Sequence, residues 1–188
     1  MKHSHGMPWR KLALLLMLAI PQLLAAKVQI TKHGDRTVYD FKIEDIVFKA
    51  VDSPNGQFQK ASLLGVDPYT AIVYEPGKPE IPVIRLLTTG KVEVSVPQKT
   101  STRTLKGHSI IPSQNPRVKV PNQQELFVID SLSYRDKQFR PSNAYSVDKA
   151  GSIRGQTQSM VTLHPIRYSP GRNEITLTHH FRVIVHHN

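Results

Sequence analysis

The chain has 188 residues and a formal net charge of +11, with 25 lysines and arginines against 14 aspartates and glutamates. It contains no cysteine, which excludes disulfides, thiolate nucleophiles, cysteine-ligated metal sites and a cysteine-linked lipid anchor. The basic balance favours acidic partners, such as anionic lipid, a cell-wall polymer or an acidic protein cleft. Nucleic acid is disfavoured, because the charges are scattered and no interleaved aromatic and basic motif is present.

The start of the chain is typical of a secretory signal peptide. A positive region with Lys2, Arg10 and Lys11 precedes a short apolar run that ends in small residues. A membrane-spanning helix needs about 20 apolar residues, so we expect cleavage here and no transmembrane segment afterwards. The sequence therefore predicts a signal peptide over residues 1–26 and a single exported domain, periplasmic or extracellular, over residues 27–188.

The rest of the chain is predicted to consist of short strands, because no window shows a sustained 3.6-residue apolar period and 14 prolines disfavour helices. The expected strands are residues 46–53, 57–64, 83–88, 91–96, 125–130, 158–163 and 174–185. We expect a first hairpin around Asn55-Gly56, a second around Thr89-Gly90 and a long final hairpin from the last two strands. Strands at this spacing predict an all-β fold, an antiparallel β-sandwich.

Proline-rich stretches separate several of these strands. “EPGKPEIPVIRLL”, residues 75–87, is a stiff, extended approach to a strand, because proline fixes its own φ and restricts the preceding residue. Residues 97–106 and 112–124 are polar and strand-poor, and we expect both to be exposed loops. In the last strand, apolar side chains of one parity share a face: Ile175, Leu177, Phe181, Val183 and Val185.

The chain offers little for catalysis. Neighbouring histidines such as His179 and His180 point to opposite faces of a strand, and His180 and His186 share a face but lie about 20 Å apart along it. A metal site that combines them with His108 or His164 stays an alternative. No nucleophile elbow, phosphate-binding loop or dinucleotide fingerprint is present. We therefore expect a protein that is not an enzyme and uses no metal or cofactor.

A series of proline- and glycine-containing motifs runs along the chain from residue 77 onward. They are Gly77-Lys-Pro-Glu-Ile-Pro-Val83, Ile111-Pro-Ser-Gln-Asn-Pro116, Phe139-Arg-Pro-Ser-Asn-Ala-Tyr145, Gly151-Ser-Ile-Arg-Gly155, Val161-Thr-Leu-His-Pro-Ile-Arg-Tyr-Ser-Pro170 and Arg182-Val-Ile-Val185. Each is weak alone, but their order and spacing resemble the propeptide of gingipain-type cysteine peptidases, peptidase family C25. The resemblance covers about residues 74–186, and we expect the glycines and prolines of the motifs to be structural.

The resemblance implies an all-β prodomain that helps a secreted protease to fold and blocks its active site until removed. In the best-known members, an exposed loop carries a basic residue into the acidic specificity pocket. This chain stops where the protease would begin and has no cysteine. We therefore expect a non-catalytic domain that binds and restrains, or chaperones, a C25-type cysteine peptidase, in trans or as part of a precursor. The alternative is a basic β-sandwich module of the cell envelope.

The candidate contact residues lie in “NPRVKVPN”, residues 115–122. A proline-framed, extended segment loses less entropy when it docks into a cleft. Arg117 is the first candidate, because a planar guanidinium suits a buried carboxylate, and Lys119 is the second. Rival contact residues are Arg103, Arg135 and Arg140. Arg154, in the turn motif, is instead expected to be a buried arginine in an ion pair.

Overall fold

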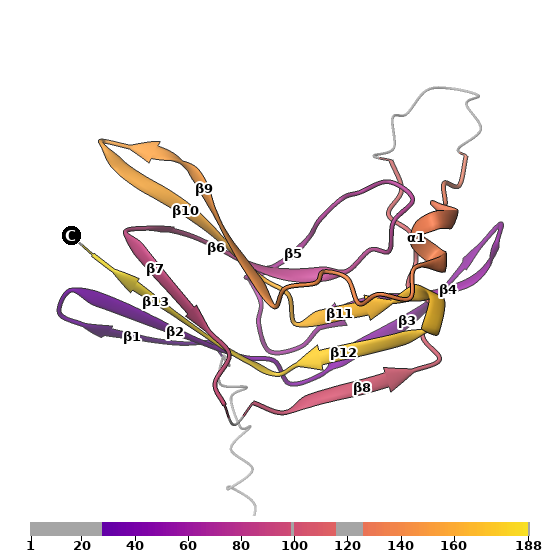
Figure 1. Ribbon diagram of the computed structural model, residues 1–188, viewed down its shortest axis with the longest axis horizontal. Helices are drawn as coiled ribbons and strands as arrows, with labels where there is room; N and C mark the ends of the chain where they lie inside the picture. The colour runs from indigo at the N-terminus through magenta and orange to yellow at the C-terminus, as the bar shows by residue number, and fades with distance from the viewer. Residues whose placement is uncertain (1–27, 99, 116–125, 188) are drawn as a thin grey trace, which may run out of the picture.

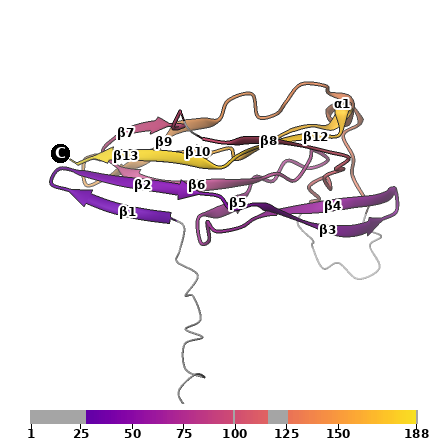
Figure 2. The same cartoon turned by 90° about the horizontal axis from the view of Figure 1, so that it is seen from below.

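The computed structural model describes residues 28–98, 100–115 and 126–187, which form antiparallel sheets and short helical segments. Figure 1 shows the strands β1, β2, β7 and β13 toward one end of the molecule, and β3, β4, β8 and β12 toward the other, beside α1. In the orthogonal view of Figure 2, the β1–β2 and β3–β4 hairpins lie at opposite ends of an elongated molecule.

Two four-stranded sheets make up most of the fold, with strand orders β1-β2-β13-β7 and β5-β6-β10-β9. Their neighbouring strands are all antiparallel. The first sheet consists of β1 (Val28–His33), β2 (Arg36–Lys42), β13 (His180–His186) and β7 (Lys91–Ser95). The second consists of β5 (Thr70–Ile72), β6 (Pro82–Thr89), β10 (Gln156–Leu163) and β9 (Tyr145–Ile153).

Two smaller sheets complete the described part of the chain. A three-stranded sheet has the order β11-β12-β8, and β3 pairs with β4. These elements are β11 (Ile166–Ser169), β12 (Glu174–Thr178), β8 (Thr102–Lys106), β3 (Ile46–Ser53) and β4 (Gly56–Leu63). The helical segments are α1 (Ser131–Arg135) and the 3-10 turn η2 (Pro170–Arg172). The molecule is therefore an all-β, antiparallel β-sandwich, as the sequence predicted.

One continuous apolar cluster joins the inner faces of the sheets. Phe41 of β2, Ile84 of β6, Leu163 of β10 and Ile175 of β12 are fully buried in it. Successive side chains of a strand point to opposite faces, so each strand contributes alternate residues. The face predicted for the end of the chain is confirmed, because all five of its members are buried: Ile175, Leu177, Phe181, Val183 and Val185.

The first predicted hairpin is confirmed. β3 and β4 pair antiparallel, with Ser53 opposite Gly56 and Pro54-Asn55 as the two-residue connection. Gly56 has φ +110°, a conformation that a residue with a Cβ rarely adopts. The turn chemistry of this segment therefore identified the hairpin correctly.

The second predicted hairpin is wrong, although both of its strands exist. β6 pairs with β5 and β10, whereas β7 pairs with β13 in the other large sheet. Between them, Gly90 has φ +116°, and a Cβ at this position would lie 2.1 Å from the carbonyl oxygen of His186. The glycine allows the chain to pass from one sheet to the other instead of turning back on itself.

The long final hairpin is also wrong. β10 pairs with β6 and β9, and residues 174–185 divide into β12 and β13, which belong to different sheets. The division falls at His179, whose carbonyl oxygen accepts a hydrogen bond from the Ile43 N–H at 2.8 Å. The odd-numbered apolar residues point into the core on both sides of His179, so the apolar pattern alone could not reveal where the strand divides.

Three further predictions need correction. Residues 97–106 are not wholly a loop, because they contain β8, an edge strand with mostly exposed side chains that pairs with β12. Residues 126–130 form no strand and lead into α1. Pro112 and Ser113, expected in an exposed loop, are buried. The first and third errors share a cause, since polar or proline-rich sequence does not reveal pairing or burial that depends on distant backbone. The second error is the converse, because a short apolar run was predicted as a strand although it has no strand partner.

Candidate functional site

The predicted contact residues Arg117 and Lys119 lie outside the described residues. The described residues stop at Asn115 and resume at Leu126. We call residues 116–125, which lie between them, the contact segment, and the structure shows what holds the residues at its two ends. Three segments meet there, residues 74–80, 110–115 and 126–136, and we call them together the frame. In Figure 1 the β5–β6 connection and α1 lie beside each other in this region.

The Gln114 side chain joins the two ends of the contact segment. Its amide Nε2–H₂ donates to the carbonyl oxygen of Val128 at 3.0 Å, and its Oε1 accepts from the Val128 N–H at 2.9 Å. The same Nε2 donates to the Pro112 carbonyl oxygen at 2.9 Å. A side-chain amide with both donors and an acceptor can thus replace a backbone pair between strands. Gln114 fixes the separation of the two ends.

Gly77 connects the proline-rich stretch to both ends. Its N–H donates to the Ser113 carbonyl oxygen at 2.8 Å, and its carbonyl oxygen accepts from the Asp130 N–H at 2.9 Å. Gly77 has φ +82°, and a Cβ here would lie 2.8 Å from the Asp130 nitrogen. Glycine is therefore required twice, for the backbone conformation and for the close approach. This agrees with the structural role expected for the motif glycine.

The prolines of residues 75–87 keep this connection extended. Pro79 forms an antiparallel β-bridge with Pro112. On either side of this bridge, the Ser113 N–H donates to the Lys78 carbonyl oxygen at 2.8 Å, and the Glu80 N–H donates to the Ile111 carbonyl oxygen at 2.8 Å. β6 then begins at Pro82. The stretch is an extended segment that pairs with residues 111–113 through its backbone and continues directly into the central strand β6.

The helix α1 secures the other end. Asp130 is its N-cap, and the carboxylate accepts from the N–H groups of Leu132 and Ser133 and from the Ser133 hydroxyl at 2.6 Å. The hydrogen bond from the Ser133 hydroxyl, with the backbone donors, lowers the pKa of Asp130. The carboxylate therefore stays ionised and keeps the cap through the ordinary pH range.

Aromatic packing attaches α1 to the sandwich. The Tyr134 hydroxyl donates to the Ile110 carbonyl oxygen, and burial raises the pKa of Tyr134. Phe58 of β4 lies 6.0 Å, between ring centroids, from both Phe127 and Tyr134. These contacts fix the frame on β4, so the ends of the contact segment rest on a rigid part of the fold.

A pocket of about 510 Å³ opens beside the frame. Its walls combine apolar side chains with paired charges, Glu75 with Lys78 and Asp136 with Arg140. His164 also lines it, and burial lowers the pKa of this imidazole. The Nδ1 atom of His164 is buried without a hydrogen-bond partner among the described residues. The charged side chains that line the pocket are therefore paired with each other, and His164 is the titratable group of the lining whose ring nitrogen is buried without a described partner.

The rival arginines lie in separate places. Arg103 pairs with Asp45, and the Nε of Arg140 lies 3.0 Å from an Asp136 carboxylate oxygen. Arg135 is exposed on the last turn of α1. Arg154 is exposed at the β9–β10 turn with φ +49°, so the prediction of a buried ion-pair residue is wrong.

The histidines do not converge. The His180 Nε2 lies 2.9 Å from the Asp40 carboxylate, which the Arg182 guanidinium also binds with two nitrogens. Burial acts to raise the pKa of Asp40, but these hydrogen bonds outweigh it and hold the pKa below the ordinary value. Within residues 28–98, 100–115 and 126–187, no group of three histidine or acidic side chains could hold a metal ion. No helix of this described part is long and apolar enough to cross a membrane.

The sequence did not identify the residues that build the frame. Gln114 lies inside one of the motifs, but only the motif's glycines and prolines were interpreted. Asp130 is the last residue of the stretch predicted to be a strand, and Tyr134 lies beyond it, where the sequence predicts no element. An Asp followed by Ser-Leu-Ser is an N-cap signal, and it was the available clue to α1.

Three kinds of comparison connect this chain to known proteins, beginning with curated relatives. Lys-gingipain and Lys-gingipain W83 of Porphyromonas gingivalis are each 22% identical over 154 residues, which is 77% of this chain. The chain spans 9% of the length of these curated relatives.

Solved structures match more of the fold. The complex of the pro- and mature domains of RgpB from P. gingivalis superposes with a TM-score of 0.68 at 18% identity, over 86% of this chain and 85% of the other. A structure that addresses zymogenic latency of gingipain K from the same organism gives 0.68 at 19% identity, over 87% and 94%. These likenesses show that the β-sandwich is of the prodomain type. The family model Propeptide_C25 matches residues 26–188, so the chain belongs to the C25 propeptide family.

Proposed function

We propose that the chain is an exported, non-catalytic domain that binds a C25-type cysteine peptidase and restrains or chaperones it, in trans or within a precursor. The observation that carries the proposal is the frame, in which Gln114 and Gly77 hold both ends of the segment that contains Arg117 and Lys119. Ends that are already fixed reduce the conformational entropy lost when the segment enters a cleft. Family membership supports the class of partner.

Arg117 is the proposed residue that enters the specificity pocket of the peptidase, and Lys119 is the second candidate. A guanidinium can form two parallel hydrogen bonds with a carboxylate, whereas an ammonium acts as a point charge. The proposed domain acts in the periplasm or outside the cell, because the predicted signal peptide over residues 1–26 would export it.

Inhibition of an Arg- or Lys-specific C25 peptidase tests this function. The chain without residues 1–26 is compared with its Arg117→Ala and Lys119→Ala variants, and Arg85→Ala on β6 serves as an exposed control outside the frame. Inhibition that is lost in Arg117→Ala supports both the function and the contact residue. Inhibition that survives both substitutions moves the contact elsewhere, and a chain that neither binds nor inhibits the peptidase refutes the function.

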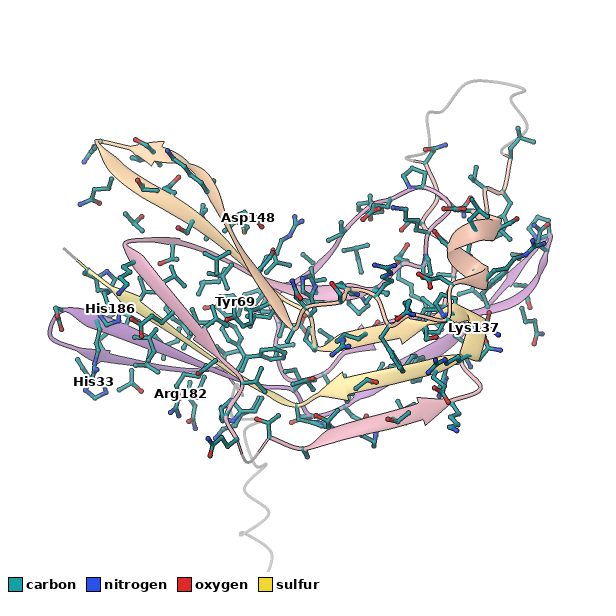
Figure 3. The ribbon with its side chains drawn as sticks, in the orientation of Figure 1. His33, Tyr69, Lys137, Asp148, Arg182 and His186 are labelled. Carbon is teal, nitrogen blue, oxygen red and sulfur yellow. The ribbon has the colours of Figure 1, made fainter. Side chains whose placement is uncertain are left out.

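A second candidate function is binding to an anionic surface of the cell envelope, and one surface favours it. On the outer face of the sheet β1-β2-β13-β7, His33, Arg36, His186 and Lys91 are cross-strand neighbours in a single row. Figure 3 places His33 and His186 at the end of the molecule opposite Lys137. Arg36 and Lys91 carry the positive charge of this row, and one carboxylate lies beside it: a Glu93 oxygen is 3.5 Å from the Lys91 Nζ and 3.4 Å from the His186 Nε2. The positive charge of this edge is what would attract an anionic ligand.

Salt-dependent binding to vesicles tests this second candidate. We expect the chain to bind phosphatidylglycerol vesicles but not phosphatidylcholine vesicles, and to be released as screening by salt increases. Arg36→Gln with Lys91→Gln should weaken this binding, whereas Arg85→Gln with Lys137→Gln removes the same charge from exposed positions elsewhere. Equal effects of the two pairs would mean that only the total charge matters.

A further inference from the structure

The hairpin of β9 and β10 extends past the rest of its sheet. β10 pairs with β6 only as far as Gln158, opposite Thr89, whereas β9 and β10 stay paired as far as Ile153 and Gln156. Figure 1 shows this hairpin projecting from the body of the molecule. Residues 152–157 form the end that β6 does not support, and every one of them is exposed. We call these residues the arm tip.

A β-bulge precedes the arm tip. Gln158 and Ser159 are consecutive in β10, but their partners in β9 are separated by one extra residue, Ala150. A bulge bends its strand and increases the local twist, and bulges often redirect a side chain toward a functional site. This bulge lies where the support of β6 ends, so the arm tip is turned relative to the sheet that carries it.

The turn of the arm tip contains an arginine in a conformation that favours other residues. Ile153 pairs with Gln156, and Arg154 and Gly155 between them have φ +49° and +78°. Two positive φ values are those of a type I′ turn, in which asparagine or aspartate followed by glycine is preferred. The other non-glycine residue with positive φ in the described part of the chain is Asn173, a residue type that tolerates this conformation. The turn therefore does not explain an arginine at position 154.

The fold makes no internal use of the Arg154 side chain. The side chain is exposed and makes no hydrogen bond, ion pair or ring contact with any described residue. Its neighbour Ile153 is 57% exposed. A Cβ at Gly155 would meet no atom within 4 Å, so this side of the turn is open to a partner. A strained backbone position that no internal contact explains points to a role in binding.

The chemistry of the arm tip suits a carboxylate on a protein surface. A guanidinium binds a carboxylate through two parallel hydrogen bonds, and arginine is enriched among the residues that dominate the binding energy of protein interfaces. An apolar neighbour such as Ile153 helps to exclude water from the pair. Anionic lipid surfaces instead attract clusters of about 4–8 basic residues, whereas Arg154 is the single lysine or arginine of the arm tip.

We propose that the arm tip is a docking site, separate from the frame, at which Arg154 binds a surface carboxylate of the C25-type peptidase and Ile153 packs beside it. This inference rests on the proposed function. Figure 1 shows the end of the β9–β10 hairpin and α1 on the same side of β11 and β12, so one partner can meet both. Figure 3 places Asp148 of this hairpin apart from Lys137, which follows α1. The arm tip can therefore be altered without disturbing the frame.

The test exchanges Arg154 for the residue that the turn prefers. Arg154→Asn removes the guanidinium but gives the turn its favoured asparagine, so the melting temperature should stay unchanged or rise. Binding of the exported chain to the peptidase should nevertheless weaken about tenfold. Arg154→Lys keeps the charge without the paired hydrogen bonds and should weaken binding about threefold. Lys49→Asn, at an exposed position of β3, removes the same charge and should leave binding unchanged.

The outcomes separate this inference from the proposed function. Wild-type binding that Arg154→Asn retains in full would overturn the arm-tip site and leave the proposed function intact. A wild-type chain that neither binds nor inhibits the peptidase would overturn both. A lower melting temperature in Arg154→Asn would assign the arginine to stability, and an equal loss of binding in Lys49→Asn would assign the effect to total charge, and either result overturns the inference. So would a loss of binding to phosphatidylglycerol vesicles in Arg154→Asn with peptidase binding retained, because the ligand would then be lipid.

Discussion

The sandwich and the frame are held together in different ways. In the sandwich, large side chains such as Phe41, Phe181 and Ile84 are fully buried in one cluster shared by the sheets. In the frame, α1 contains no buried residue, and single groups such as the Gln114 amide carry the connections. The sandwich depends on apolar area, which is non-directional, whereas the frame depends on the position of individual atoms.

This difference separates stability from function in the molecule. Apolar packing tolerates changes of side chain when volume and pattern are preserved. Positions such as Gln114 and Gly77 do not tolerate a change of side chain in the same way, because no other residue makes the same hydrogen bonds or close approach. Core substitutions should therefore unfold the whole domain, while frame substitutions should release the contact segment and leave the sandwich folded.

The largest effect is expected in the core. Phe181→Ala removes a fully buried ring and should lower the free energy of unfolding by about 3–5 kcal/mol. Urea unfolding followed by circular dichroism measures the loss. Ile153→Ala, at an exposed position, should change the value by no more than about 0.5 kcal/mol. A small effect of Phe181→Ala would contradict the single shared core.

The next effect separates backbone strain from steric clash in the frame. Gly77 and Gly107 have φ +82° and +77°, but only Gly77 has neighbours that a Cβ would strike. Gly107→Ala should cost about 1–3 kcal/mol for the left-handed conformation, and Gly77→Ala about 1–3 kcal/mol more for the clash with Asp130. Equal losses of unfolding free energy in the two variants would show that the frame shifts to accommodate the added Cβ at no cost.

The sandwich was largely predictable from the sequence because its signals are local. Alternation placed Phe181, Val183 and Val185 on one face, and Asn55-Gly56 marked the first hairpin, both as observed. Partners were harder to predict, since the pattern of a strand does not say which strand lies beside it. Gly90 was interpreted as a turn, whereas its close approach to the His186 carbonyl oxygen lets the chain change sheets.

The frame could not be predicted because its contacts cross long distances in the sequence. Nothing near Gly77 indicates that its neighbours are Ser113 and Asp130. The motifs did identify the right segments, since two of them contain Gly77 and Gln114. The roles of Arg117 and Lys119 stay predictions, because both residues lie outside the described part of the chain.

A smaller effect is expected when the link between the two ends is removed. Gln114→Ala deletes the hydrogen bonds to Val128 and Pro112 and should cost about 1–2 kcal/mol. Hydrogen exchange should accelerate at the Val128 N–H and stay slow in β10. Gln138→Ala alters an exposed glutamine after α1 and should leave both rates unchanged. Unchanged exchange at Val128 would refute the role given to Gln114.

The smallest effect is a dependence of stability on pH that arises from two partly buried histidines. Burial lowers the pKa of His164, in the pocket, and of His108, which stacks on Phe48 with 3.9 Å between ring centroids. Because an imidazole in the unfolded chain titrates near pH 6.5, the unfolded state binds these protons more readily. The contribution to stability is therefore complete above about pH 6.5 and decreases as the pH falls below it.

Urea unfolding at several pH values between 5 and 8 measures this dependence. His164→Gln should reduce the loss of stability on acidification. The variant has no imidazole to protonate in the pocket, where the Nδ1 atom of His164 is buried without a described hydrogen-bond partner. His33→Gln removes an exposed histidine of β1 and should leave the slope as in the wild type. If the free energy of unfolding of His164→Gln still falls with pH as steeply as in the wild type, the acid sensitivity comes from His108 in the sandwich. The pocket beside the frame would then make no contribution to it.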